Sequence, residues 1–177
     1  MKYCKVCDEP FNPYMTTQKV CNLKCAVQLA KKQTEKKVDK EFKERKLALK
    51  SKSEWMKEAQ QAFNEFIRER DKGKPCISCD KMDDGAHQRH ASHYRSVGAC
   101  TSLRFNTFNV HASCMQCNSI LSGNLIEYRL RLKLKLGIKR LDWLECQNEI
   151  VRYDIDYAKR IKGIFKKRTR IYKKLIR

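Results

Sequence analysis

Apolar residues recur at intervals of three and four positions in the segment after Ser51, which predicts an amphipathic helix over residues 53–71. Ser51 and Glu54 have the spacing of a capping box at the start of this helix. Gly73 and Pro75 stop the helical pattern. The predicted apolar face consists of Trp55, Ala59, Ala62, Phe63, Phe66 and Ile67.

Four more segments have helical patterns. Residues 26–50 contain nine Lys/Arg and only scattered apolar residues, which is typical of a solvated basic helix or a partly disordered connector. Residues 125–136 are predicted to form a basic helix with Asn124 as its N-cap and Gly137 at its end. A shorter helix is expected near residues 141–151. The tail, residues 157–177, predicts a basic amphipathic helix whose apolar face consists of Ile161, Ile164, Phe165, Ile171, Tyr172 and Leu175.

These patterns predict a helix-rich α+β protein with four parts. Residues 1–25 form a small N-terminal knuckle, and residues 26–52 form a basic helical connector. A central domain covers residues 53–137, and basic C-terminal helices cover residues 138–177. The loop-rich stretch 76–117 holds all four histidines and five of the ten cysteines, so we expect the chemistry there.

The charge balance narrows the choice of partner. With 40 Lys+Arg and 20 Asp+Glu, the 177-residue chain has a formal charge of +20, which favours polyanions such as nucleic acid. The chain opens Met1-Lys2-Tyr3-Cys4, without the apolar stretch of a secretory signal. The longest run free of charged residues, 107–126, is rich in Asn, Ser, Cys and His, so no membrane span is expected. A cytoplasmic location with reduced thiols follows as an expectation.

Eight of the cysteines are paired at metal-ligand spacing. Cys76-x2-Cys79 and Cys114-x2-Cys117, separated by 34 residues, predict a four-thiolate structural zinc with no open coordination position. A second structural zinc is predicted for Cys4, Cys7, Cys21 and Cys25. Cys100 and Cys146 have no partner at this spacing and are expected to be small buried or half-buried thiols.

The zinc-flanked loop carries a further pattern. A histidine, a downstream asparagine and an asparagine directly after the last cysteine give the order found in HNH (ββα-metal) nucleases; these are His93, Asn109 and Asn118. Residues 55–129 resemble the phage lambda NinG (Rap) recombination family. The matching motifs are Phe63-Asn64-x-Phe66-Ile67-Arg68-Glu69-Arg70-Asp71, Pro75-Cys76-Ile77-Ser78-Cys79, His93-Tyr94-Arg95, Leu103-Arg104-Phe105-Asn106-x-x-Asn109 and Ser122-Gly123-Asn124-Leu125. The zinc frame is also similar to that of phage endonuclease VII, a junction resolvase.

The resemblance implies roles for individual residues. His93 corresponds to the general base, and an imidazole suits proton removal from water near neutral pH. Asn109 matches the asparagine that holds the loop and orients the base, and Asn118 matches a ligand of a catalytic Mg²⁺ or Mn²⁺. Many HNH enzymes have an acid just before the base, where this chain has Ser92. His90, two residues earlier on the same strand face, is the candidate replacement ligand.

Other polar residues of the loop have less specific interpretations. Asp83 and Asp84 are fallback ligands, although a Met-Asp-Asp-Gly sequence is more typical of a turn. His87 and His111 are expected to be exposed or hydrogen-bonded loop histidines.

The function implied by the resemblance is a structure-specific DNA endonuclease, a hydrolase acting on branched recombination intermediates such as Holliday junctions and D-loops in a phage-infected bacterial cell. Two alternatives are a noncatalytic zinc-finger protein that binds DNA and an HNH nuclease of the restriction or homing type. The expected partners are branched DNA and a second copy of the chain, because resolving a four-way junction needs two matched cuts. No membrane partner is expected.

Overall fold

The computed structural model describes residues 1–175 and divides between Lys50 and Ser51 into two compact units. In the first unit, β1 (Lys2–Tyr3) and β2 (Pro10–Phe11) pair antiparallel and precede the long helix α1 (Leu23–Ala48). Asn22 caps α1 by accepting a hydrogen bond from the Cys25 backbone N–H. Within α1, Cys25 is the buried residue, so the helix is solvated along its length, as its scattered apolar residues indicated.

The second unit is built around one short β-ribbon. Strand β3 (His90–His93) pairs antiparallel with β4 (Val110–Ser113). The remaining elements are α2 (Lys52–Arg70), the 3₁₀ turn η1 (Thr101–Leu103), the π-helical turn η2 (Gln116–Ile120), α3 (Leu125–Leu136), α4 (Ile138–Cys146) and α5 (Ile155–Leu175). The chain is therefore a helix-rich α+β protein, as predicted.

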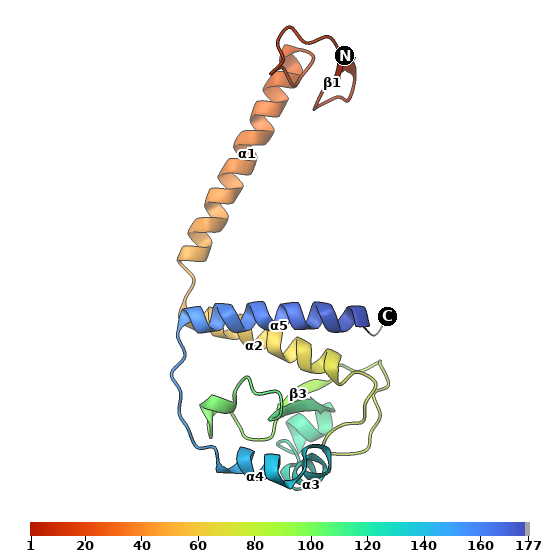
Figure 1. The fold of residues 1–177 in the computed structure, drawn as a ribbon, viewed down its shortest axis with the longest axis vertical. Coiled ribbons are helices and arrows are strands. Elements are labelled where there is room, and N and C mark those ends of the chain that lie inside the picture. Colours follow the sequence, from red (N-terminus) through yellow and green to blue (C-terminus); the bar gives the residue numbers. More distant parts are fainter. Residues whose placement is uncertain (176–177) are drawn as a thin grey trace. The chain divides into compact units, whose positions relative to one another are not determined.

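Helices cover both faces of the ribbon (Figure 1). On one face, α2 and α5 lie side by side over Ala91 and Val110. On the other face, α3 and α4 form a second core from Tyr128, Leu132, Leu141 and Leu144. Because side chains alternate along a strand, neighbouring residues of β3 and β4 face different cores.

Helix α2 forms as its sequence predicts. Ser51 accepts a hydrogen bond from the Glu54 N–H, and the Glu54 carboxylate accepts one from the Ser51 N–H, which completes the capping box. The apolar face of the helix is buried, with Phe63 and Ile67 fully enclosed. The helix begins and ends one residue earlier than expected.

The C-terminal helices differ from the prediction in their boundaries and contacts. Helix α4 starts directly after Gly137 and ends at Cys146. The prediction of a helix near 141–151 therefore placed it too far toward the C-terminus. In α5, Ala158, Ile161, Phe165 and Thr169 are buried against α2. Ile164, Ile171 and Leu175, which were placed on the apolar face, are exposed. The last two residues of the predicted tail helix lie outside the described range.

The structure corrects two smaller expectations, one of them only in part. Cys146 is exposed rather than half-buried, whereas Cys100 is buried as expected. Asn124 occupies the N-cap position of α3 as predicted, but its backbone is in the left-handed region with φ of 47° and its side chain makes no capping hydrogen bond. Across residues 1–175, no helix is both long and apolar enough to span a membrane.

Candidate metal centres and the histidine strand

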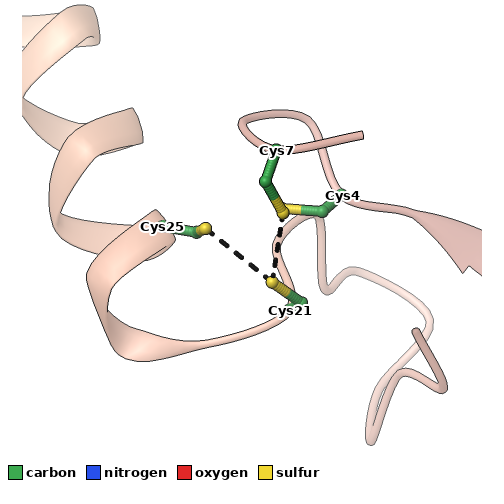
Figure 2. A group of neighbouring side chains, drawn as sticks. All are labelled: Cys4, Cys7, Cys21 and Cys25. Atoms are coloured by element: carbon green, nitrogen blue, oxygen red, sulfur yellow. Dashed lines mark hydrogen bonds between the residues drawn. The ribbon is translucent and has the colours of Figure 1, made fainter. Parts of the chain in front are cut away.

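The first cysteine cluster joins the N-terminal strand pair to the start of α1. Its four sulfurs, from Cys4, Cys7, Cys21 and Cys25, lie within 4.8 Å of one another. Figure 2 shows Cys21 between the sulfurs of Cys7 at 3.6 Å and Cys25 at 3.7 Å. A tetrahedral ion with Zn–S bonds of about 2.3 Å has S···S edges of about 3.8 Å. The cluster therefore has the donor set and size for zinc.

The second cysteine cluster lies in the unit that contains the ribbon. The sulfurs of Cys76, Cys79, Cys114 and Cys117 also lie within 4.8 Å of one another, with Cys79 and Cys114 3.8 Å apart. The backbone N–H of Cys114 donates to the Cys76 sulfur, and that of Cys117 donates to the Cys114 sulfur. Such N–H···S bonds orient ligands in thiolate metal sites. Both predicted cysteine sets thus form clusters that could hold a structural zinc ion.

The pKa values show why four neighbouring thiols suit a cation. Burial and the neighbouring sulfurs raise the pKa of Cys25 to about 12 and also raise the pKa of Cys117. Burial also opposes ionisation of Cys114, but hydrogen bonds from Cys117 outweigh it and lower the pKa of Cys114 to about 7. The four thiols of a cluster cannot all ionise at neutral pH without a positive ion to offset their repulsion.

Asn124 braces the second cluster from the loop before α3. Its side-chain amide donates to the Ser78 carbonyl at 3.0 Å and lies 4.0 Å from the Cys117 sulfur. Ser78 in turn donates its buried hydroxyl to the Gly123 carbonyl at 2.9 Å. The Asn124 side chain therefore contacts the cysteine loop and not the first turn of α3.

His93 ends strand β3 on the face that contacts α2. It pairs with Val110, and its ring centroid lies 6.5 Å from that of Phe63. Its Nε2 lies 3.0 Å from the Arg104 carbonyl oxygen. Since a carbonyl oxygen only accepts, Nε2 donates the proton, and a neutral His93 keeps the free lone pair on Nδ1. Burial, with a smaller contribution from the Arg104 charge, lowers the pKa of His93 below its usual value and favours this neutral form.

Asn109 is fully buried and ties together the loop between the two strands. Its Oδ1 accepts from the Arg95 N–H at 2.8 Å, and its Nδ2 donates to the carbonyls of Arg95 and Leu103. Its own carbonyl accepts from the Tyr94 N–H. Asn109 thus fixes the segment that directly follows His93.

His90 and Asn118 are half-buried and lie apart from His93, one on the ribbon and one in η2. His90 begins β3 opposite Ser113, on the same face as Ser92 and on the face opposite His93. Asn118 lies in η2, directly after the last cysteine of the second cluster, where its backbone N–H donates to the Cys114 carbonyl. Within residues 1–175, the two cysteine clusters are the groups in which three or more His, Cys, Asp or Glu ligand atoms meet.

The other histidines and the Asp83-Asp84 pair have structural contacts. Asp83 accepts from the Gly73 and Gly85 N–H groups, and Asp84 accepts from the Ala86 and His87 N–H groups. The segment is therefore a turn. His87 is exposed and contacts Asp84. His111 is not a loop residue, because it lies buried in β4 with its Nδ1 3.2 Å from the Tyr128 hydroxyl.

Sequence reasoning missed the role of Arg70 and Asp71 at the end of α2. Asp71 is 3% exposed and accepts from the Ala112 N–H of β4 at 3.0 Å. Arg70 donates to the carbonyls of Thr107 and Val110. Although burial opposes ionisation, Arg70 and Lys135 lower the pKa of Asp71 to about 2. Adjacent opposite charges at the end of an amphipathic helix were the only local signal for this anchor of β4.

The described residues define a basic, helix-rich α+β protein with two four-cysteine clusters suited to zinc. A family model described as "Bacteriophage Lambda NinG protein" matches residues 1–175, so the chain belongs to the NinG family. It is 36% identical over 182 residues to Protein ninG of Escherichia phage lambda, covering 93% of this chain and 88% of that protein. The identity is also 36% to Protein ninG of Escherichia phage 933W, with 94% and 91% covered, and of Salmonella phage P22, with 93% and 89% covered. No solved structure matches the chain.

Proposed function

We propose that this chain is a metal-dependent DNA endonuclease that hydrolyses phosphodiester bonds in branched recombination intermediates. The observation that carries the proposal is the environment of His93. Its Nε2 is engaged by the Arg104 carbonyl, its Nδ1 is left as a proton acceptor, and Asn109 holds the segment that directly follows it. A neutral imidazole in this state can accept a proton from an attacking water molecule. The resemblance to HNH nucleases supports the same assignment.

The proposed catalytic ion is Mg²⁺ or Mn²⁺. When bound, it would offset the negative charge that develops on the phosphate. Asn118 and His90 are the residues that would hold it. Mg²⁺ usually takes few protein ligands and fills its other positions with water and substrate phosphate; here Asn118 would supply an amide oxygen and His90 a ring nitrogen. The buried Ser113 hydroxyl, which lacks a hydrogen-bond partner among residues 1–175, lies opposite His90 and adds an oxygen on that face.

The proposed substrate is recognised by shape and charge. Exposed lysines and arginines line the outer side of α5, and Lys166, Arg170 and Lys174 contribute to a shallow groove with Glu65. Phosphate contacts of this kind position DNA without selecting a base sequence. Two such chains, related by a two-fold axis, would place two cleavage sites on one four-way junction.

The decisive experiment incubates purified protein with labelled duplex, single-stranded, forked and four-way DNA, with and without Mg²⁺ or Mn²⁺. Cleavage of the branched substrates is expected, and His93→Ala should abolish it while zinc content and junction binding stay close to wild type. Because the pKa of His93 is lowered, the fall in rate toward acid should lie below pH 6.5. Cleavage by His93→Ala at the wild-type rate would refute the base assignment.

Light scattering on the junction-bound protein should give the mass of a dimer.

A noncatalytic DNA-binding protein with zinc knuckles is the second candidate. It is favoured by Ser92, which is 3% exposed and stands where an acid is expected. The position of His90 and His93 on opposite ribbon faces also favours it. If the wild-type protein binds four-way DNA but cleaves none of the substrates with either ion, this candidate replaces the nuclease.

A further inference from the structure

Arg104 belongs to the Leu103-Arg104-Phe105-Asn106 motif, for which the catalytic proposal supplies no side-chain role. Its backbone carbonyl accepts the His93 Nε2 hydrogen bond, so its side chain starts beside the candidate base. Its guanidinium Nε donates to the Gln60 Oε1 of α2 at 2.9 Å. Gln60 is itself held by donating its amide to Asn64 at 2.8 Å. One edge of the guanidinium is therefore fixed by a chain of amides on α2.

The flat side of the same guanidinium is also fixed. Its central carbon lies 5.4 Å from the ring centroid of Phe105, which packs edge-on against Phe63 at 5.7 Å. Phe63 is the ring that also contacts His93. Arg104 and His93 thus share one aromatic support, and neither side chain is positioned independently of the other.

The guanidinium has a charge without a counterion. Among residues 1–175, no carboxylate forms an ion pair with Arg104, whereas Arg70, Arg89, Arg129 and Arg131 are each paired with one. The terminal nitrogens of Arg104 have no hydrogen-bond partner in the same range. Burial lowers the pKa of Arg104, and its charge in turn lowers the pKa of His93. A half-buried cation with two free terminal nitrogens fits a bidentate anion.

We propose that Arg104 binds a phosphodiester group of the nucleic acid directly beside His93, with Gln60 and Phe105 holding the guanidinium in place. This inference deepens the proposed function, because it names the residue that brings the phosphate to the candidate base. An arginine contributes planar, two-point recognition of phosphate oxygens, which a lysine at the same place does not.

The test is independent of cleavage. Zinc-loaded full-length protein, labelled with ¹⁵N, is titrated with the dinucleotide dTpdT and separately with inorganic phosphate at constant pH and ionic strength. The His93 ring signals are followed by NMR. The dinucleotide should shift them in a saturable way, and Arg104→Met should weaken this binding by about tenfold or more. Arg104→Lys should restore only part of it.

Arg140→Met is the matched control, because Arg140 of α4 also lies over an aromatic ring, that of Phe108 at 4.7 Å. It should leave the His93 response unchanged. Zinc content and thermal unfolding verify that each variant is folded. If Arg104→Met does not fold, the comparison of Arg104→Lys with the wild type still tests the proposal. An unchanged response in Arg104→Met, an equal response in Arg104→Lys, or a response to inorganic phosphate without one to dTpdT would overturn the proposal.

Cleavage of four-way DNA by the same variants separates this inference from the proposed function. If the wild-type protein binds dTpdT through Arg104 but cleaves no substrate, the nuclease assignment fails and the phosphate site stands. If it cleaves DNA and Arg104→Met leaves both the rate and the dinucleotide affinity unchanged, the phosphate site fails and the nuclease assignment stands.

Discussion

At the residue scale, His111 shows how burial makes a single side chain responsive to pH. It is 2% exposed, and burial together with the positive charges of Lys135 and Arg70 lowers its pKa to about 3. In the unfolded chain the imidazole takes up a proton near pH 6.5, so the unfolded state binds more protons below that pH. The stability that neutral His111 contributes is therefore complete above pH 6.5 and is lost progressively as the pH falls toward 3.

We predict that His111→Gln flattens the dependence of the unfolding free energy on pH below 6.5. Glutamine keeps a hydrogen-bond donor for the Tyr128 hydroxyl but does not titrate. Between pH 6.5 and about 3, each unit by which the pH falls lowers the unfolding free energy of the wild type by about 1.4 kcal/mol through His111. Urea unfolding at several pH values measures the difference.

The control for this prediction is His87→Gln, the same substitution at an exposed histidine. It should leave the pH dependence as in the wild type. Zinc retention has to be measured at each pH, because acid also protonates the cysteine thiols. Equal slopes for wild type and His111→Gln would contradict the prediction.

At the element scale, the pairing of α2 with α5 depends on aromatic contacts. Phe165 is 3% exposed, and its ring lies edge-on to Phe63 at 4.7 Å and close to Phe66 at 5.4 Å. Phe165→Ala would leave a cavity between the two helices. We expect it to lower the unfolding free energy by about 3–5 kcal/mol. Chemical unfolding followed by tryptophan fluorescence measures this change, because Trp55 lies in α2.

The neighbouring position provides a matched control. Ile164 is 38% exposed on the same helical turn, and Ile164→Ala should change the unfolding free energy by no more than about 0.5–1 kcal/mol. Similar effects of the two variants would mean that α5 does not pack on α2 through the face that carries Phe165.

The elements themselves were largely predictable. The capping box of Ser51 and Glu54, the stripe of α2 and the end of α3 at Gly137 are local features, and the structure confirms them. The face of α5 was predicted only in part. In this basic helix, Ile161 and Ile164 satisfy the helical spacing equally, and only contact with α2 selects Ile161 for burial.

At the scale of the whole molecule, the two cysteine clusters belong to different compact units. We predict about two zinc ions per chain by elemental analysis. Cys4→Ser should remove one ion and leave the tryptophan-monitored unfolding unchanged, because both tryptophans follow Ser51. Cys76→Ser should remove one ion and also destabilise the second unit. Full zinc content in Cys76→Ser would contradict the four-thiolate assignment.

DNA affinity should respond to salt through exposed cations of the second unit. The triple variant Lys166→Gln, Lys167→Gln and Arg170→Gln should flatten the slope of log K against log[salt] by about 0.9 for each phosphate that these side chains neutralise in the wild type. Deletion of the tail is not a suitable test, because Ala158, Ile161 and Phe165 belong to the core. Binding to four-way DNA at several salt concentrations measures the slope.

The control triple is Lys31→Gln, Lys32→Gln and Lys36→Gln, on the exposed surface of α1. It changes the net charge by the same amount in the other unit. If both triples flatten the slope equally, the effect comes from net charge rather than from phosphate binding by α5.

The sequence by itself determined the two sets of cysteine ligands, the start of α2 and the alternation of residues along β3, because spacing within a few residues controls each of them. Three long-range hydrogen bonds depend on the tertiary structure alone. The Asp71 carboxylate accepts from the Ala112 N–H of β4, and the Asn124 amide donates to the cysteine loop and not to the first turn of α3. The Gln60 amide oxygen accepts from the Arg104 guanidinium beside His93. The partners in each of these hydrogen bonds are far apart in the sequence. Their geometry depends on how α2 and the ribbon pack, and no local periodicity encodes that packing.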